Sequence, residues 1–368
     1  MKSSAVAEPI RIGIFGTGFA RHVILPCLRH VDGVHLAGIC SHRLERAEAA
    51  AAEFGIEHAA LHHRAVLERA RPELVFIATP PHRHAEMAID ALQTGCHVVC
   101  EKPTALTARQ SRAMLAAALR RPEKLALIDH ELRFDPGRLA LRDQIASGRL
   151  GVICHLRYTL DSPARRDREA PWSWWSDRAQ GGGALGAIGS HAVDSLRCLL
   201  ADEVAEVRGF LHTFIAERVD PGTGRNRAVS ADDLAAAWLR FRSGAIASVS
   251  ISTVEGRRLH RITVAGTDAC ASLDEQGPLR IAVGRDSWAA VPVPDGLPSS
   301  EELGIPNTDW ARSFLRMARR VVEAIRSGQA SVPGAATFED GHRTQLVLDA
   351  IRRSADEAAW VRIVEEAP

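Results

Sequence analysis

Apolar runs and helical patterns alternate along the first third of the chain. Five short apolar runs have the length and flanking turn residues of buried strands, and they cover residues 10–15, 35–40, 74–78, 97–100 and 125–128. Helical periodicity fills the gaps, over a segment ending at Arg29 and over 44–54, 84–94 and 108–120. Because strands separated by such helices need parallel crossovers, the pattern predicts an α/β fold with a doubly wound parallel sheet.

The pattern changes after residue 133. One more helix is expected at 137–147, and alternating segments then follow at 152–160, 204–215, 233–241, 245–253 and 258–265. Short turns such as 242–244 join them, which indicates an antiparallel or mixed sheet. Helices are expected at 309–327 and 339–359, and a surface loop at 291–306. We therefore expect one domain at 1–133 and a second, α+β domain at 134–368.

Composition narrows the class of protein. The 368 residues are 46% hydrophobic and carry 46 Lys plus Arg against 45 Asp plus Glu, so disorder is excluded and a net charge of +1 gives no footprint for nucleic acid or an anionic membrane. Seven scattered cysteines indicate reduced thiols. No apolar run approaches the ~18 residues of a membrane span, and no signal peptide is recognised. A cytoplasmic protein is expected.

The first strand ends in a glycine motif that opens a helix. Gly16, Thr17, Gly18, Phe19 and Ala20 stand where backbone amides can approach a pyrophosphate at a helix N-terminus. The third small position of the motif is Arg21, so packing of the helix on the strand falls to Ala20. The Arg21 side chain either reaches a phosphate or is solvated.

The end of the second strand bears on the choice between dinucleotides. An acid there accepts hydrogen bonds from the ribose of NAD and repels the extra phosphate of NADP. Here the residues are Ser41, His42 and Arg43, with no carboxylate among them. This favours NADP(H), with NAD(H) possible because many such strand ends still accept it.

Lysine is rare in this chain, which draws attention to Lys102. The other lysines are Lys2 and Lys124. Lys102 follows Glu101 where an apolar strand stops, and Pro103 disfavours helical geometry at it, so its side chain is expected at the carboxyl edge of the sheet, where ligands bind in this architecture. It could hold or relay a substrate proton. The alternative is a surface lysine at a strand end.

A glycine-rich segment, residues 181–189, precedes an apolar helix expected at 195–200. So many glycines imply a close approach of the backbone to something. His191 and Asp194 share one face at this point, and the histidine is either an acid or base at a carbinol or a core histidine capped by Asp194. Trp174 and Trp175 precede the glycines, where their rings could stack on a sugar or pack in the core.

Together these motifs resemble the Gfo/Idh/MocA oxidoreductases over nearly the whole length. The resemblance rests most on the Glu-Lys-Pro motif at 101–103 and on the glycine-rich segment that ends in His191 and Asp194. It implies an N-terminal dinucleotide-binding Rossmann domain and a C-terminal domain for substrate binding and oligomerisation, with an open, mostly antiparallel mixed sheet. It also implies hydride transfer between nicotinamide and a sugar or polyol, in a homodimer or homotetramer formed through that sheet.

The resemblance also assigns residues. Lys102 and His191 match the catalytic pair, and Glu101 matches a residue near the nicotinamide ribose. Ala78, Thr79, Pro80 and His84 fall in a segment that passes the cofactor. The expected substrate-binding set is Lys102, Arg133, Trp174, Trp175, His191 and Asp194. The chain departs from the family at Ala187, where an aspartate is usual, so part of the acid–base relay is missing and Asp194, Glu131 or His130 would have to compensate.

Two other functions stay open. A redox-neutral enzyme would keep its cofactor and cleave a glycoside or epimerise a sugar through transient oxidation. A catalytically silent sensor would bind the dinucleotide without turnover. No metal site is expected, because His82 and His84 have no further partner at ligand spacing.

Overall fold

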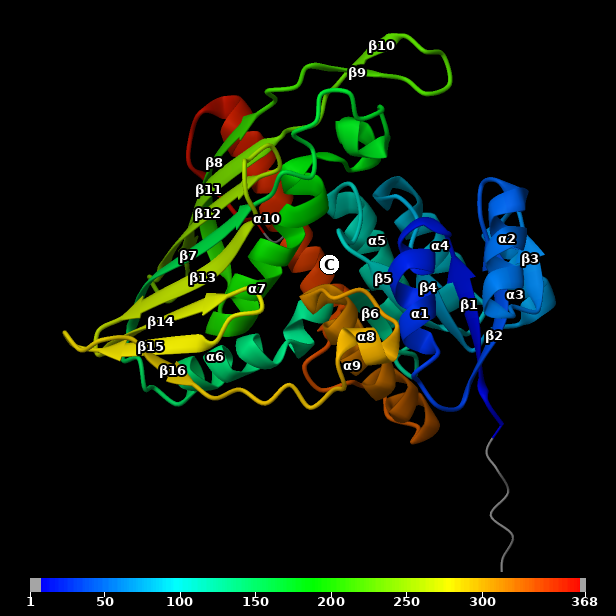
Figure 1. Cartoon of the computed structure of the whole chain (residues 1–368), viewed down its shortest axis with the longest axis horizontal. Coiled ribbons are helices and arrows are strands. Elements are labelled where there is room, and N and C mark those ends of the chain that lie inside the picture. The colour runs from blue at the N-terminus through cyan, green and yellow to red at the C-terminus, as the bar shows by residue number, and fades with distance from the viewer. Residues whose placement is uncertain (1–7, 365–368) are drawn as a thin grey trace, which may run out of the picture. The chain divides into compact units, whose positions relative to one another are not determined.

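The computed structural model describes residues 8–364, which form two compact units (Figure 1). Of the described residues, unit 1 comprises 8–104, 112–134 and 297–339, and unit 2 comprises 105–111, 135–296 and 340–364. This division differs from the expected boundary at 133/134. The chain returns to unit 1 after residue 296 because the long helix α9 (Asp309–Arg326) packs in the core of that unit.

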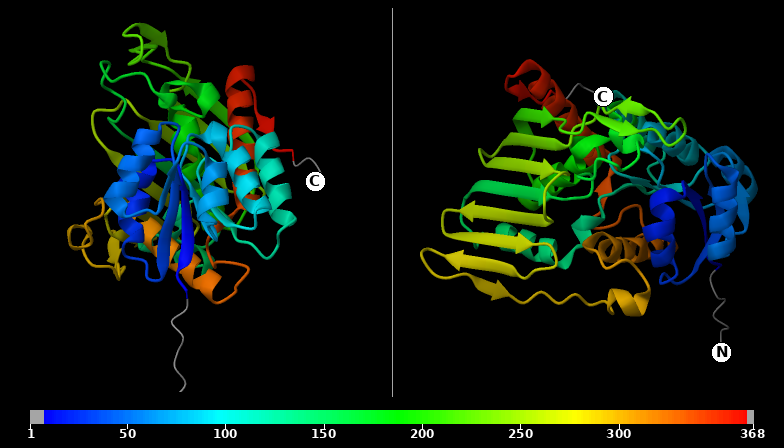
Figure 2. Two further views of the ribbon diagram at one scale, coloured as in Figure 1. Left: turned by 90° about the vertical axis from the view of Figure 1, so that its right-hand side faces the viewer. Right: turned by 45° about the horizontal axis from the view of Figure 1, so that its top comes forward.

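Unit 1 is built on a seven-stranded sheet in the order β17-β6-β5-β4-β1-β2-β3. Its strands are parallel except β17, which runs antiparallel to β6. The bounds are β1 Ile10–Phe15, β2 Val34–Cys40, β3 His58–Ala60, β4 Leu74–Ile77, β5 His97–Glu101, β6 Ala126–Asp129 and β17 Ala336–Thr337. Strand order reverses at β1, so the crossover helices lie on both faces of the sheet (Figure 2).

Most helices of unit 1 follow the expected pattern. The first helical segment is split into a π-helical part, η1 (Ala20–Ile24), and α1 (Leu25–Leu28). The others are α2 Leu44–Phe54, α3 His63–Ala70, η2 Pro81–Arg83, α4 His84–Gln93, α5 Ala108–Leu119, η3 Glu131–Phe134, α8 Ser300–Leu303 and α9 Asp309–Arg326. Strand β3 and helix α3 are additions to the predicted set, and α8 lies in the segment predicted as a loop.

Helix α9 completes the core of unit 1. The Thr308 side chain accepts from the Ala311 N–H at 3.2 Å and caps its start. One face is apolar and buried, with Phe314 against Phe76 of β4 at 5.6 Å between ring centroids. Burial of this face removes the helix from water and ties the segment after residue 296 to the N-terminal sheet.

Unit 2 is built on a nine-stranded mixed sheet in the order β16-β15-β14-β13-β7-β12-β11-β8-β18. Only β7 and β12 pair in parallel; the other pairs are antiparallel. The bounds are β7 Ile153–Asp161, β8 Val204–His212, β11 Leu234–Phe241, β12 Ile246–Ser252, β13 Leu259–Gly266, β14 Ala269–Asp274, β15 Leu279–Val283, β16 Ala289–Val291 and β18 Val361–Arg362. The predicted fold class is confirmed in both units.

One face of this sheet carries the core of unit 2 (Figure 2). Its helical elements are α6 Pro136–Ala146, η4 Trp174–Ser176, η5 Arg178–Gln180, η6 Leu185–Gly189, α7 Ser190–Leu200 and α10 Phe338–Glu357, and a two-stranded hairpin joins β9 Glu217–Val219 to β10 Asn226–Ala228. Along β11, Ala237 and Leu239 are buried whereas Trp238 is exposed, which is the alternation of a sheet with one covered face. Between residues 8 and 364, none of the helices has the length and apolar character needed to cross a bilayer.

Candidate functional site

The strands of unit 1 bring the predicted cofactor residues to one edge of the sheet. Phe15 of β1 pairs with Cys40 of β2 and with Ile77 of β4, and Ile77 pairs with Cys100 of β5. The residues that follow these strand ends therefore share the carboxyl edge, where open α/β sheets bind ligands at the point of strand-order reversal. Figure 1 shows β1, β4 and β5 side by side.

Two glycines give this edge its shape. Gly16 has φ +103°, and a Cβ on it would lie 2.5 Å from the Ala78 carbonyl oxygen, so only glycine allows this approach of the two loops. A Cβ on Gly18 would meet no atom within 4 Å. The start of the helix is thus open on the side where a pyrophosphate would bind. The backbone N–H groups of the glycine motif at this helix N-terminus fit the phosphates of a dinucleotide.

The end of β2 is polar and basic. Ser41 is buried, and its hydroxyl lies 3.3 Å from that of Thr17. Burial, followed by the charges of Arg43 and Arg46, lowers the pKa of His42. The Arg21 Nε donates to Glu53 of α2 at 2.5 Å, and both side chains are partly exposed. A contact of Arg21 with a phosphate stays a prediction.

His84 ties together two loops of the edge. Its Nδ1 lies 2.9 Å from the Pro103 carbonyl oxygen and its Nε2 lies 2.8 Å from that of Thr79. Burial lowers the pKa of His84 to about 4, although both carbonyl contacts act in the opposite direction. The neutral ring donates to one carbonyl at a time. Through these two contacts, His84 holds the loop after β4 close to the loop after β5.

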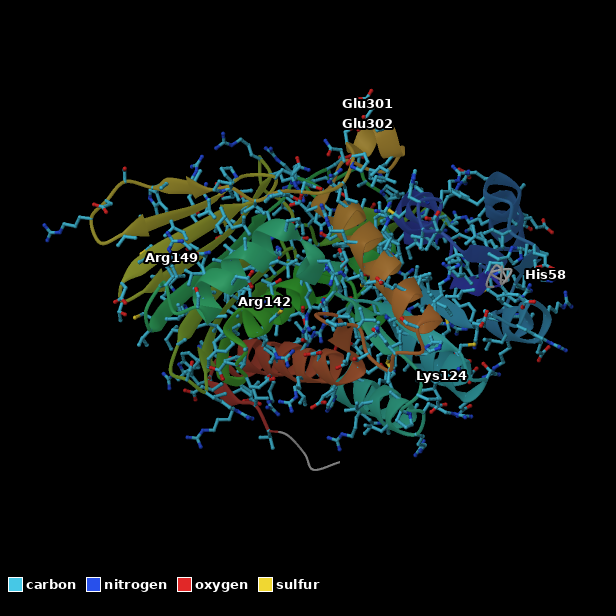
Figure 3. All side chains as sticks on the ribbon, turned by 90° about the horizontal axis from the view of Figure 1, so that it is seen from below. His58, Lys124, Arg142, Arg149, Glu301 and Glu302 are labelled. Carbon is cyan, nitrogen blue, oxygen red and sulfur yellow. The ribbon has the colours of Figure 1, made fainter. Side chains whose placement is uncertain are left out.

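Glu101 and Lys102 occupy the end of β5. Glu101 is buried, Lys102 is half-buried, and the peptide bond from Lys102 to Pro103 is cis. Lys124, in contrast, lies in the turn before β6 (Figure 3). Beside Glu101 stands Asp129, the last residue of β6 and its partner in register. Our sequence reasoning missed Asp129, because only the register of β5 and β6 brings it to the edge.

The neighbourhood of Arg133 also belongs to unit 1. Arg133 is half-buried in η3, the single turn that follows β6, and Phe134 behind it is buried under the guanidinium of Arg320 of α9 at 5.9 Å. This packing fixes the turn at the same carboxyl edge of the sheet as Lys102.

The glycine-rich segment of unit 2 approaches other parts of its own chain. A Cβ on Gly182 would lie 2.5 Å from the carbonyl oxygens of Trp174 and Trp175, and one on Gly183 would lie 2.6 Å from the Asp232 carboxylate. Asp232 in turn accepts from the Leu185 N–H at 2.7 Å. The expected close approach is therefore present, and its partners are protein atoms.

Helix α7 begins at Ser190, earlier than the predicted residue 195, and so includes His191 and Asp194. Both side chains are buried, three residues apart on the same helix. The π-helical turn η6 directly before it contains Ala187, which is buried as well. Such π-helical turns are frequent at functional sites.

The tryptophans before this segment are half-buried. The Trp174 and Trp175 rings lie 5.4 Å apart between centroids, at 46°. The Trp172 Nε1 donates to the Ala228 carbonyl oxygen of the β9–β10 hairpin, and Arg227 lies 3.4 Å above its ring. Trp172 thus anchors the hairpin, which leaves Trp174 and Trp175 as the pair with surface to offer a ligand.

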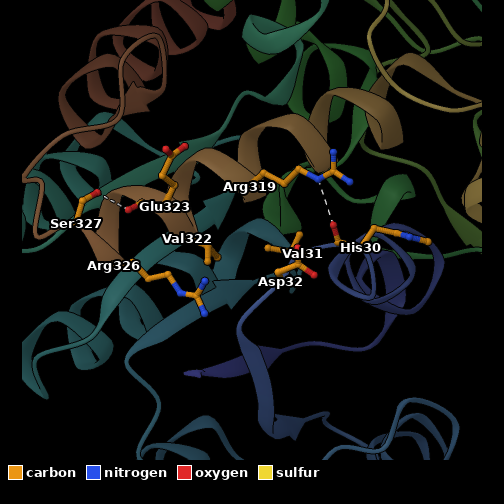
Figure 4. Close-up of a pocket in the computed structure, with 8 residues that line it drawn as sticks. All are labelled: His30, Val31, Asp32, Arg319, Val322, Glu323, Arg326 and Ser327. Carbon is orange, nitrogen blue, oxygen red and sulfur yellow. Dashed lines mark hydrogen bonds between the residues drawn. The ribbon is translucent and has the colours of Figure 1, made fainter. Parts of the chain in front are cut away.

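Two other features of unit 1 are not part of the predicted site. A cavity of about 450 Å³ is formed by the turn at 30–32 before β2 and by α9, where the Arg319 Nε donates to the His30 carbonyl oxygen at 3.1 Å (Figure 4). It is at the amino-terminal end of β2, opposite Ser41. A second cluster, His63 with Glu86 and Asp90, has metal-ligand spacing, but the Arg64 Nε already donates to the Asp90 oxygen that His63 contacts.

Comparison with known proteins agrees with this geometry. Residues 10–128 match the model of the oxidoreductase family with an NAD-binding Rossmann fold, and residues 139–272 match the GFO/IDH/MocA C-terminal domain. Levoglucosan dehydrogenase of Pseudarthrobacter phenanthrenivorans is 30% identical over 347 residues, which are 87% of each chain. D-glucoside 3-dehydrogenase of Escherichia coli is 34% identical over 205 residues, 54% of this chain and 56% of that one. A solved complex of levoglucosan dehydrogenase with NADH and L-sorbose superposes with a TM-score of 0.85 at 25% identity, covering 98% of this chain and all of that one.

Proposed function

The chain belongs to the Gfo/Idh/MocA oxidoreductases, and from this premise we propose that it transfers hydride between a nicotinamide dinucleotide and a secondary alcohol or keto group of a sugar or polyol. The observation that carries the proposal is the position of Lys102, at the carboxyl edge that Gly16 and Gly18 open for a dinucleotide. Unit 1 would bind the dinucleotide, and unit 2 would supply residues for the substrate.

The cofactor-binding residues form a set along this edge. When bound, the nicotinamide supplies the hydride acceptor or donor. The residues that would hold the dinucleotide are Gly16, Thr17, Gly18, Phe19, Ala20, Ser41, His42, Arg43, Ala78, Thr79, Pro80, His84, Glu101 and Lys102. Among them, His84 acts by holding the loops that carry Thr79 and Pro103.

Acid–base work falls to Lys102 and His191. The Lys102 side chain, as the neutral amine, would take the proton of the reacting alcohol as hydride leaves carbon and so become the ammonium; in the reverse direction the ammonium would return that proton to the carbonyl oxygen. His191 would hydrogen-bond a hydroxyl of the substrate and orient it. Arg133, Trp174, Trp175 and Asp194 would complete the substrate site, the tryptophans by stacking on the sugar ring.

We propose NADP(H) as the preferred dinucleotide. The end of β2 offers the Ser41 hydroxyl, the His42 imidazole and the cation Arg43, and Arg46 of α2 adds a second positive charge. These groups suit a ribose phosphate better than a free hydroxyl pair. The known complex with NADH belongs to a relative, so NAD(H) is the alternative outcome of the test.

Levoglucosan and D-glucosides are the substrates that the names of the relatives suggest for this chain. Ala187 keeps the redox-neutral enzyme as a second candidate, because a relay that lacks one acid suits a cofactor that is regenerated in place. The free thiols of all seven cysteines support a reducing, cytoplasmic compartment. The exposed aromatics Phe210 and Trp238 of the unit 2 sheet support a homodimer or homotetramer formed through that sheet.

The decisive experiment is a cofactor-reduction screen of the purified protein with NAD⁺ and NADP⁺ against levoglucosan, D-glucosides, polyols and inositols. Net reduction with one of these substrates, lost in His191→Ala while the dinucleotide still binds, is the expected result. Conversion of a glycoside or an epimerisable sugar with the cofactor unchanged would replace the dehydrogenase by the redox-neutral enzyme. Binding without conversion, unaltered in His191→Ala, would identify a sensor.

A further inference from the structure

Two carboxyl groups meet inside unit 1 at the ends of β5 and β6. Glu101 and Asp129 are partners in the register of these strands, and both side chains are buried. Their carboxyl groups hydrogen-bond to each other. Two carboxyl groups can share a hydrogen bond only if one of them is protonated. One of these two groups is therefore a neutral carboxylic acid.

The surroundings decide which carboxyl group holds the proton. Burial raises the pKa of both groups, and that of Asp129 lies well above its usual range because Glu101 and Glu131 add negative charge beside it. Lys102 acts on Glu101 in the opposite direction, through its charge and through its backbone N–H, which donates to the Glu101 carboxylate. The other titratable neighbours are the thiols of Cys100 and Cys27, whose pKa burial raises.

We propose that Asp129 is a positioning residue that remains a neutral carboxylic acid, donates its proton to Glu101, and so holds Glu101 as an anion beside Lys102. The inference rests on the proposed function only in giving Lys102 a catalytic role. Asp129 itself touches neither substrate nor cofactor in this scheme. It acts by fixing the charge and the rotamer of its neighbour.

The unpartnered oxygens of the pair agree with a single negative charge shared by the two carboxyl groups. Asp129 Oδ1 and Glu101 Oε1 are buried without a hydrogen-bond partner. A carboxylic acid that donates from one oxygen leaves a weakly polar carbonyl oxygen on the other, which costs less in a dry site than an ionised oxygen without a partner. A second ionised carboxylate at this place would carry the larger penalty.

Two substitutions test whether the Asp129 side chain is a neutral hydrogen-bond donor or an ionised carboxylate. Asp129→Asn keeps the shape and an N–H donor but never ionises, so it should preserve most of the turnover and the acidic limb of the pH profile. Asp129→Leu removes the donor, and Glu101 then ionises only at higher pH. We expect turnover to fall at least about tenfold at neutral pH and its acidic limb to move to higher pH.

Infrared spectroscopy reads the proton directly and needs no substrate. Wild-type protein at neutral pH should show the carbonyl stretch of a buried carboxylic acid that Asp129→Asn lacks. Thermal unfolding of both variants checks that they fold. Because this readout works on any folded protein, absence of sugar oxidation would defeat the proposed function and leave the carboxyl pair in place.

Three results would overturn the inference. One is the absence of a carboxylic acid band that depends on Asp129. Another is a shift of the acidic limb to lower pH in Asp129→Asn, which would mean that an ionised neighbour had been removed from Glu101. The third is a folded Asp129→Leu protein with the wild-type pH profile, because the residue would then be structural only.

Discussion

Gly16 and Ala78 lie in contact across the ends of β1 and β4, so close that a Cβ on Gly16 would stand 2.5 Å from the Ala78 carbonyl oxygen. Gly18, two residues on, has open space where its Cβ would be. The two glycines of one motif therefore serve different needs. One lets the protein fold, and the other leaves room for a ligand.

Alanine substitutions should distinguish the folding role of Gly16 from the ligand-binding role of Gly18. Gly16→Ala should lower the free energy of unfolding by about 2 kcal/mol or more, because its φ of +103° and the clash with Ala78 both oppose a side chain. Gly18→Ala should unfold like the wild type yet bind the dinucleotide more weakly. Urea unfolding and cofactor titration measure the two effects, and weakened stability in Gly18→Ala with normal binding would contradict this division.

Cofactor preference should depend on the end of β2. The wild type should bind NADP(H) more tightly than NAD(H), and Ser41→Asp should reverse the order by weakening NADP(H) about tenfold or more, since a carboxylate would face the phosphate at short range. Ser41→Ala is the matched control for loss of the hydroxyl. Fluorescence titration of both dinucleotides is sufficient, and a wild-type preference for NAD(H) would refute the assignment.

Turnover should depend on Lys102 far more than binding does. Lys102→Met keeps most of the aliphatic stem, so we expect kcat to fall by ~10²- to 10⁴-fold with a modest change in dinucleotide affinity. Lys124→Met, in the turn before β6, is the control and should behave as wild type. A Lys102→Met enzyme with unchanged kcat would exclude a role in proton transfer.

Acid should destabilise the protein through His84. Burial lowers the pKa of His84 to about 4, against 6.5 in the unfolded chain, so the unfolded state binds more protons between these values. The stabilising contribution is complete above about pH 6.5 and is lost as the pH falls toward 4, by roughly 3 kcal/mol. Urea unfolding across this range should fall less steeply in His84→Gln, whereas the exposed control His62→Gln should follow the wild type.

The open face of the unit 2 sheet should carry the contact between copies of the chain. Trp238 is about half exposed there and stacks on His155 at 5.8 Å between ring centroids. Trp238→Glu should lower the molecular mass in solution by disrupting an apolar interface. Trp288→Glu, equally exposed in the loop between β15 and β16, is the control. Light scattering measures the molecular mass of each variant in solution. An oligomer unaffected by Trp238→Glu would mean that the contact between copies lies elsewhere.

Local sequence patterns predicted the fold class, and the resemblance of the motifs to a known family predicted the family and the oxidoreductase activity; all three are confirmed. The patterns failed where packing overrides local preference. The helix after the glycine-rich segment was expected at 195–200, yet Leu185 and Ala187 are buried in a helical turn and α7 already begins at Ser190. Strand β3 spans three residues and α3 begins with two polar ones, so neither had a strong periodic signal.

Asp129 shows what lies beyond local patterns in the site. Asp129 is a single acid at the end of an apolar strand, with no motif around it. Its proposed role depends on its pairing with Glu101, which lies on a different strand, 28 positions earlier in the chain. The assignments of the other site residues remain predictions. They follow from motif positions, whereas the role of Asp129 follows only from the register of two strands.

The return of the chain to unit 1 has a consequence for synthesis. Residues 10–129 contain six of the seven strands of the unit 1 sheet, but β17 and α9 leave the ribosome about two hundred residues later. Until then, the apolar surface that receives Phe314 and Leu315 stays exposed to water or to other nascent chains. The N-terminal sheet can form early, but α9 can cover its apolar surface only after most of unit 2 has been translated.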